Sequence, residues 1–119
     1  MIEKLFYRKL YGEPSSQRTR NEIDDLESYL SRYTPENREG FSVGKDGGGI
    51  KYVLKTGALI SLSVQGNFSI VTVQTNVKSN GLFKKLRDVY TEINLSHYDW
   101  GIAYTVIIII ANFSWCGVV

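Results

Sequence analysis

The sequence has few of the residues that form disulfides, metal sites and redox centres. Among 119 residues there is one cysteine, Cys116, and one histidine, His97. A single cysteine excludes an intrachain disulfide and any site held by several thiolates. Nothing in the composition requires an oxidising compartment, so we expect a cytoplasmic protein without metal or other cofactor.

The sequence also lacks a continuous apolar run at its amino terminus and a strong excess of one charge. Its first residues, MIEKLFYRKLYGEP, interrupt the apolar positions with Glu3, Lys4, Arg8 and Lys9, unlike the core of a secretory signal. The formal net charge of +2 is too small to indicate a nucleic-acid partner by itself. A content of 43% hydrophobic and 22% charged residues is typical of a packed globular protein, and the length favours one domain over residues 1–119.

The first forty residues predict two helices. Ile2, Leu5, Phe6 and Leu10 follow helical spacing, which predicts a helical arm over residues 1–12. The turn-forming stretch GEPSSQRTR then separates this arm from an α+β core over residues 20–119. A second helix is expected from about 20 to 33, with acidic residues in its first turns and Pro35 as its stop.

From residue 41 the apolar pattern changes to a period of two. Three runs, over residues 50–55, 58–65 and 68–77, predict a three-stranded antiparallel meander with a tight turn at Gly66 and Asn67. A helical pattern returns over residues 82–93, with Ser79 or Asn80 as its N-cap. Packing amphipathic helices on the meander gives a two-layer α+β domain.

The last nineteen residues, GIAYTVIIIIANFSWCGVV, contain no charged side chain. This segment is nearly long enough to cross a membrane, so a carboxyl-terminal anchor is one hypothesis. The β-branched run 106–110 and the alternation over residues 104–116 instead favour a long final strand that completes the antiparallel sheet. We therefore expect the strand, and a membrane partner remains the alternative.

No motif indicates catalysis, so an enzyme is not expected. The glycines of VGKDGGGIKY fit neither phosphate-binding pattern and are typical of a hairpin loop with positive φ angles. His97 and Asp99 have no accompanying nucleophile, and Cys116 lies in the most apolar segment, where a packing role is expected.

The remaining signals concern surfaces. Lys84, Lys85 and Arg87 lie near the predicted start of the last helix, where positive charge opposes the helix dipole and suggests a binding use. The predicted amino-terminal arm offers a further partner-binding set, consisting of Leu5, Phe6, Tyr7, Leu10 and Tyr11. Basic residues that could contact nucleic acid are Arg18, Arg20 and Lys78, together with Lys84 and Lys85.

At the level of layout only, this order of elements resembles the secretion-chaperone-like and small inhibitor folds of bacteria and their viruses. The resemblance implies a protein that acts by binding another protein, as an inhibitor, an immunity-like protein or a chaperone-like adaptor. The sequence thus favours a small protein-binding module with an acidic partner surface and possible homodimers. A nucleic-acid binder is the second hypothesis.

Overall fold

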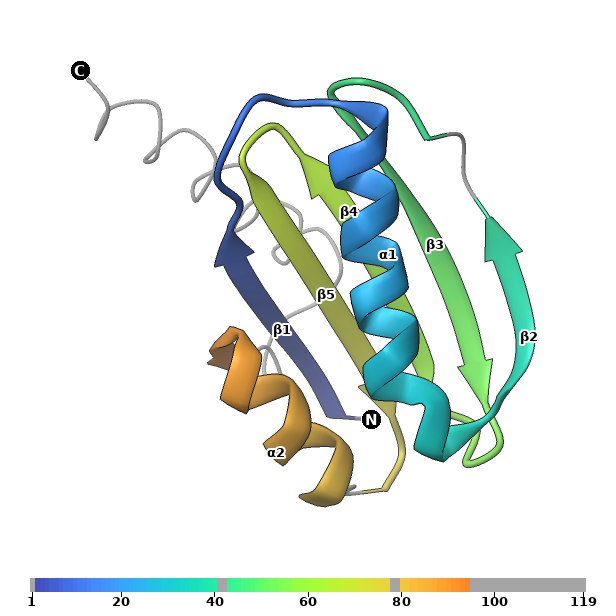
Figure 1. The fold of residues 1–119 in the computed structure, drawn as a ribbon. Helices are drawn as coiled ribbons and strands as arrows, with labels where there is room; N and C mark the ends of the chain where they lie inside the picture. The colour runs from blue at the N-terminus through green and yellow to red at the C-terminus, as the bar shows by residue number, and fades with distance from the viewer. Residues whose placement is uncertain (1, 41–42, 78–79, 95–119) are drawn as a thin grey trace.

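The computed structural model describes residues 2–40, 43–77 and 80–94, and it has an α+β fold with an antiparallel sheet (Figure 1). The sheet contains β1 (Ile2–Lys9), β2 (Pro35–Gly40), β3 (Gly47–Leu54), β4 (Leu59–Gln65), β5 (Phe68–Thr75) and β6 (Thr91–Asn94). The helices are α1 (Ser16–Leu30), which continues into the 3-10 turn η1 (Ser31–Tyr33), and α2 (Asn80–Val89).

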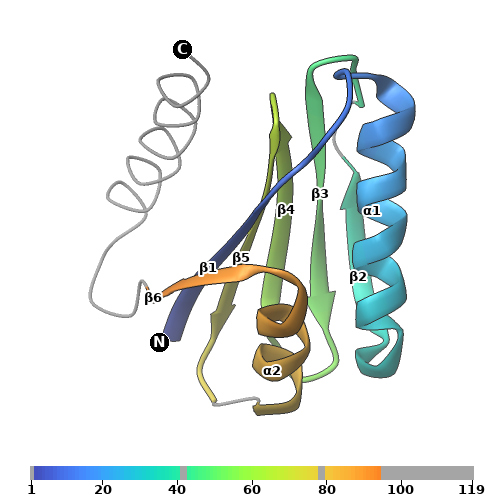
Figure 2. The same cartoon turned by 60° about the vertical axis from the view of Figure 1, so that its left-hand side comes forward.

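The strand order is β2-β3-β4-β5-β1-β6, and every neighbouring pair is antiparallel. The first strand of the chain therefore lies between the fifth and the sixth. Both helices cover the same face of the sheet (Figure 2), with α1 over β3 and β4 and α2 over β1 and β6. This arrangement leaves β2 and β6 as the two outer strands among the described residues.

The predicted amino-terminal helix is wrong, because residues 2–9 form the internal strand β1. The same residues satisfy a period of two: Phe6 faces the helices and its neighbour Leu5 faces the other way, and both side chains are fully buried. A helix would bury only one stripe, whereas a strand between β5 and β6 buries apolar residues on both faces. The segment is thus part of the sheet and not a separate arm.

The helix α1 begins four residues before the predicted start at 20. Ser15 is its N-cap, and the Ser15 side chain accepts a hydrogen bond of 3.0 Å from the backbone N–H of Arg18. The first turn consequently contains no acidic residue, so the expected dipole role of the acidic cluster does not hold. Its members lie in the body of the helix, where the structure gives Glu22 and Glu27 other partners.

The short strands β2 and β6 were not predicted from the sequence, and the glycine run was expected in a loop. The strand β2 has the sequence PENREG and is exposed along its whole length, so it has no apolar alternation to detect. The helix expected to reach residue 93 ends at Val89, and Thr91–Asn94 form β6. Gly47, Gly48 and Gly49 lie in β3 rather than in a loop, and none has a positive φ.

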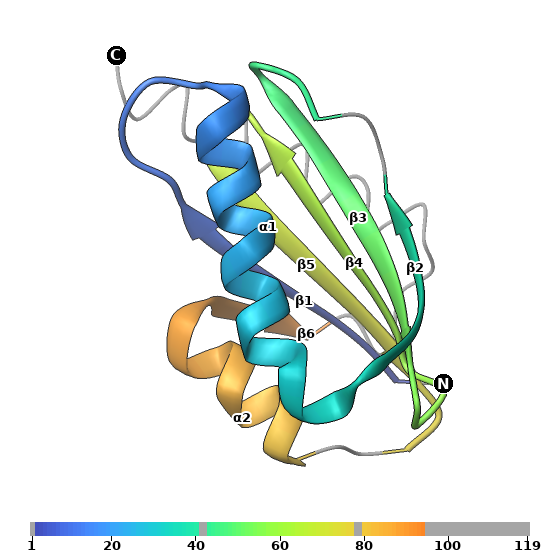
Figure 3. The ribbon, with the colours of Figure 1, turned by 45° about the vertical axis from the view of Figure 1, so that its right-hand side comes forward.

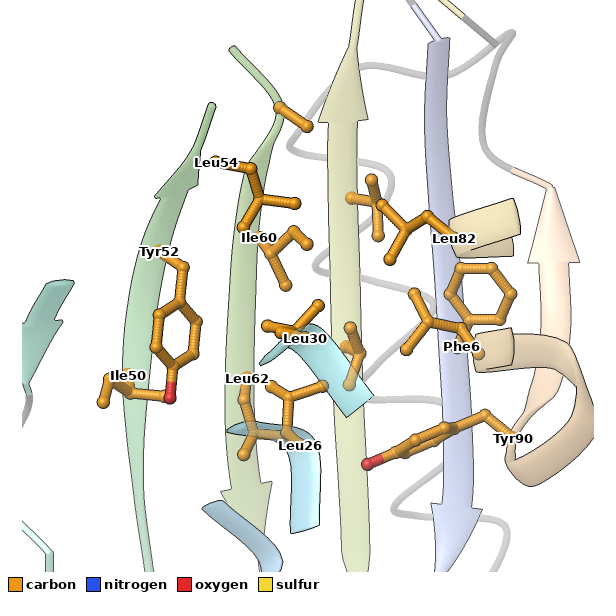
Figure 4. Close-up of a cluster of buried hydrophobic side chains, with 14 of the residues drawn as sticks. Phe6, Leu26, Leu30, Ile50, Tyr52, Leu54, Ile60, Leu62, Leu82 and Tyr90 are labelled. Atoms are coloured by element: carbon orange, nitrogen blue, oxygen red, sulfur yellow. The ribbon is translucent and has the colours of Figure 1, made fainter. Parts of the chain in front are cut away.

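The core lies between the helices and the helix-facing side of the sheet (Figure 4). Leu26 and Leu30 of α1 pack over Ile60 and Leu62 of β4, whereas Phe6 contacts the α2 side, where its ring centroid lies 6.5 Å from that of Phe83. All of these aliphatic side chains are at most 1% exposed. Burial of each contributes about 1.5–3 kcal/mol, which holds the helices in fixed positions on the sheet.

Several predictions concern residues outside the described ranges. These are Lys78, His97, Asp99, Cys116, the long strand over residues 104–116 and the alternative membrane anchor over 101–119. Within residues 2–40, 43–77 and 80–94, no helix combines the length and the hydropathy that a membrane crossing requires.

Candidate functional site

A charged pair lies between α1 and the sheet. Arg8 of β1 donates two hydrogen bonds to the carboxylate of Glu22, from Nε to Oε2 at 2.8 Å and from Nη2 to Oε1. A third contact, of 3.3 Å, joins Arg8 Nη2 to Asp25 at the solvent side. The Glu22 side chain is only 2% exposed, so Arg8 provides the compensating charge for a buried carboxylate.

Tyr90, which follows α2, completes this cluster. The Arg8 guanidinium lies 4.9 Å from the centroid of the Tyr90 ring, within the range of a cation–π contact. The Tyr90 hydroxyl lies 3.5 Å from the hydroxyl of Ser69 on β5. Burial, followed by the charge of Glu22, raises the pKa of Tyr90 to about 12, and the hydrogen bond with Glu22 raises the pKa of Arg8. The cluster thus links both helices to the sheet.

A second charged pair joins α1 to the outer strand β2. Arg38 Nη2 lies 2.6 Å from Glu27 Oε1, and the hydroxyl of Tyr52 donates a hydrogen bond of 2.9 Å to the same oxygen. Burial and this hydrogen bond raise the pKa of Tyr52. The charged groups of this pair are much more exposed, at 56% for Arg38 and 34% for Glu27.

The predicted basic residues of α2 lie on its solvent side. Leu82, Phe83 and Leu86 of this helix are buried, whereas Lys84 and Arg87 are exposed. Lys85 is partly buried, and its Nζ lies 5.8 Å from the centroid of the Tyr29 ring on α1. We call Tyr29, Lys84, Lys85 and Arg87 the α2 basic surface.

The dipole argument for this surface does not hold. The first turn of α2 begins at Asn80 and contains no lysine or arginine, and Arg87 lies in the last turn, where positive charge is favourable. What distinguishes Lys84 and Arg87 is that neither forms an ion pair or a side-chain hydrogen bond within residues 2–40, 43–77 and 80–94. Their charges are therefore available to an external partner.

The predicted amino-terminal binding residues divide into buried and exposed members. Leu5 and Phe6 are 0% exposed, so neither side chain is available at the surface. Tyr7 is partly buried, and its ring centroid lies 6.4 Å from that of Phe68. Leu10 donates a backbone hydrogen bond to the Asn67 carbonyl, whereas Tyr11 is 82% exposed. The structure does not bring this set together with the α2 basic surface.

The predicted nucleic-acid contacts are also dispersed. Arg18 has a structural role, because it donates hydrogen bonds to the carbonyls of Gly12 and Gly66 and to the Asn67 side chain, and so ties α1 to the turn between β4 and β5. Arg20 is exposed and lies beside β2, at the sheet edge opposite to that covered by α2. Arg20 and Lys84 therefore do not form one basic surface.

Two hollows in the described part of the chain were not anticipated from sequence. One, of about 460 Å³, lies on β3 and β4, where glycines leave the sheet backbone accessible; it is lined by Gly47, Gly48, Gly49, Lys51, Ser61, Leu62, Ser63, Val64 and Gln65. The other, of about 310 Å³, lies between α1 and the β2–β3 edge. The second hollow includes Arg38 and Gly40, whose only signal in the sequence was a polar stretch after Pro35.

Comparison of the chain with protein-family models, with curated proteins and with solved structures finds no match. Among residues 2–40, 43–77 and 80–94, no group of three or more potential metal ligands converges. The described residues form an α+β protein with a six-stranded antiparallel sheet, and a fold of this class does not by itself imply a function.

Proposed function

We propose that this chain is a small, non-catalytic protein-binding module that docks the α2 basic surface on an acidic surface of another protein. Such a module would act as an inhibitor, as an immunity-like protein or as a chaperone-like adaptor. The observation that supports the proposal is the exposure of Lys84 and Arg87 without anionic partners among the described residues.

The packing of α2 supports the same proposal. Because its apolar side is anchored in the core through Leu82, Phe83 and Leu86, the helix presents its charged side on a rigid support. Lys85 rests on the Tyr29 ring, so the surface combines cations with an aromatic side chain, a composition found at interface hot spots. Exposed cations of this kind raise association rates with acidic partners and make them dependent on salt.

The experiment is affinity capture from the native host with the full chain and a triple variant, Lys84→Glu, Lys85→Glu and Arg87→Glu. The matched control carries Lys9→Glu, Lys45→Glu and Lys55→Glu, three exposed lysines outside α2 with the same change in charge. A partner protein that is lost with the α2 variant and kept with the control supports the proposal. Retention of every partner by the α2 variant contradicts it.

Nuclease treatment separates this proposal from the nucleic-acid alternative. Capture that survives nuclease indicates a protein partner. Capture that requires intact nucleic acid, together with binding that weakens steeply between 50 and 200 mM salt, supports the alternative instead.

A further inference from the structure

The outer strand β2 offers backbone groups to a further strand. All six of its residues are exposed, and among the described strands β3 is its only neighbour (Figure 3). Its pairing with β3 shifts register between Pro35 and Asn37, and the remainder, from Asn37 to Gly40, is regular. An exposed edge is a template for another strand, and Pro35, the register shift and the charged side chains of β2 limit such pairing to the regular part of the strand.

The hollow of about 310 Å³ lies directly beside this edge. Its α1 wall consists of Arg20, Ile23 and Asp24; the remaining lining residues are Arg38, Gly40, Val43, Gly49 and Ile50. The space beside Gly40 is open, because a Cβ atom added there would meet no atom within 4 Å. The floor is apolar, since Ile23 and Ile50 are 5% and 2% exposed.

The cation of the hollow that is available to an anion is Arg20. Arg20, Arg38 and the carboxylate of Asp24 line the hollow, and the charge of Arg38 is balanced by Glu27. The Arg38 guanidinium is paired with Glu27, which also accepts the Tyr52 hydrogen bond, and because this pair is exposed Arg38 can exchange Glu27 for a carboxylate ligand at little cost. Arg20 has no ion pair among the described residues. A planar carboxylate matches the donor geometry of guanidinium groups.

We propose that β2 binds an extended peptide segment of a partner protein, which adds a strand to the sheet and places an acidic side chain between Arg20 and Arg38. Side chains that alternate along the added strand point toward the helix-facing side at every second position, so one of them is directed to the hollow. This site lies on the opposite half of the sheet from the α2 basic surface and goes beyond the function proposed above.

The test uses the full chain and a fluorescent peptide of alternating threonine and valine with one central glutamate, followed by fluorescence anisotropy. A second peptide has glutamine in place of the glutamate. We expect the glutamate peptide to bind at least about tenfold more tightly, as for a charge-assisted pair. Arg20→Gln is expected to remove most of this preference, whereas Arg32→Gln, at an exposed arginine of η1, preserves it.

Two further arms test the added strand and the location. Methylation of the peptide nitrogens that face β2 should abolish binding, and free N-acetylglutamate should not compete at the same concentration. The triple charge reversal of α2 should leave peptide binding intact. Any one of five results overturns the proposal. Three concern affinity: equal affinity of the two peptides, an unchanged preference in Arg20→Gln, or no binding at millimolar peptide. The other two are effective competition by the free acid and loss of binding in the α2 variant.

Discussion

The two ion pairs that connect α1 to the sheet have the same parts in different surroundings. Each joins a strand arginine to a glutamate of α1, and each has a tyrosine beside it: Tyr90 with Arg8 and Glu22, and Tyr52 with Arg38 and Glu27. The first reaches the internal strand β1, and the second reaches the outer strand β2. The glutamate side chain is 2% exposed in the first pair and 34% exposed in the second, and the arginine side chain is 24% and 56% exposed.

This difference determines what each pair contributes. A buried carboxylate that loses its partner keeps its desolvation cost, so the inner pair is essential once Glu22 is present. An exposed pair exchanges its partner for water at little cost. The inner pair therefore fixes the position of α1 relative to β1, whereas the outer pair leaves Arg38 available for another role.

The largest effect is expected from breaking the inner pair on one side. Arg8→Leu should lower the free energy of unfolding by about 3–5 kcal/mol, because Glu22 remains buried without a cation. Urea denaturation of both proteins measures the difference. As a control, Arg8→Leu combined with Glu22→Leu should recover most of the loss; a double variant as unstable as the single one would show that the charge of Glu22 is not the cause.

The inner pair also explains why part of the fold escaped prediction. Ile2, Leu5 and Phe6 fit a helical stripe as well as an alternating strand, and nothing local decides between them. The decision comes from distant residues: β5 and β6 flank the segment, and Glu22 of α1 meets Arg8. By contrast, the run over residues 58–65 alternates without ambiguity and was predicted to within one residue of β4.

The second effect concerns the tyrosine of the inner pair at high pH. The pKa of Tyr90 is raised from 10.0 to about 12, so its contribution to stability is complete below pH 10 and is lost as the pH rises from 10 to 12. This rise in the pKa corresponds to about 2–3 kcal/mol of folding stability. Tyr90→Phe should remove this part of the alkaline loss in urea denaturation, whereas Tyr11→Phe, at an exposed ring, should leave the pH profile unchanged.

Only one of the two candidate sites, the α2 basic surface, could be predicted from the sequence. The exposed cations of α2 follow from helical spacing, because its apolar stripe defines the opposite side. The hollow beside β2 depends on Arg20 and Arg38, which lie eighteen positions apart and approach only when β2 pairs with β3. A polar edge strand has no periodic signal, so neither the strand nor the hollow could be inferred.

A smaller effect is expected at the tyrosine of the outer pair. Tyr52→Phe removes the hydroxyl that donates to Glu27 at 2.9 Å while keeping the buried ring. Because Glu27 is partly solvated and retains Arg38, the expected loss is about 1–2 kcal/mol, near the lower end for hydrogen bonds to charged groups. A double-mutant cycle with Glu27→Gln isolates the coupling, and a coupling near zero would contradict the proposed contribution of this hydrogen bond.

The smallest effect is expected from breaking the outer pair itself. Arg38→Ala should cost less than about 1 kcal/mol, because Arg38 is 56% exposed and Glu27 keeps the hydrogen bond from Tyr52. Increasing sodium chloride to about 1 M, where the Debye length is only about 3 Å, should remove most of this difference. The cost of Arg8→Leu should persist in the same salt, since its cause is a buried carboxylate. If salt reduces both costs equally in urea denaturation, burial does not distinguish the two pairs.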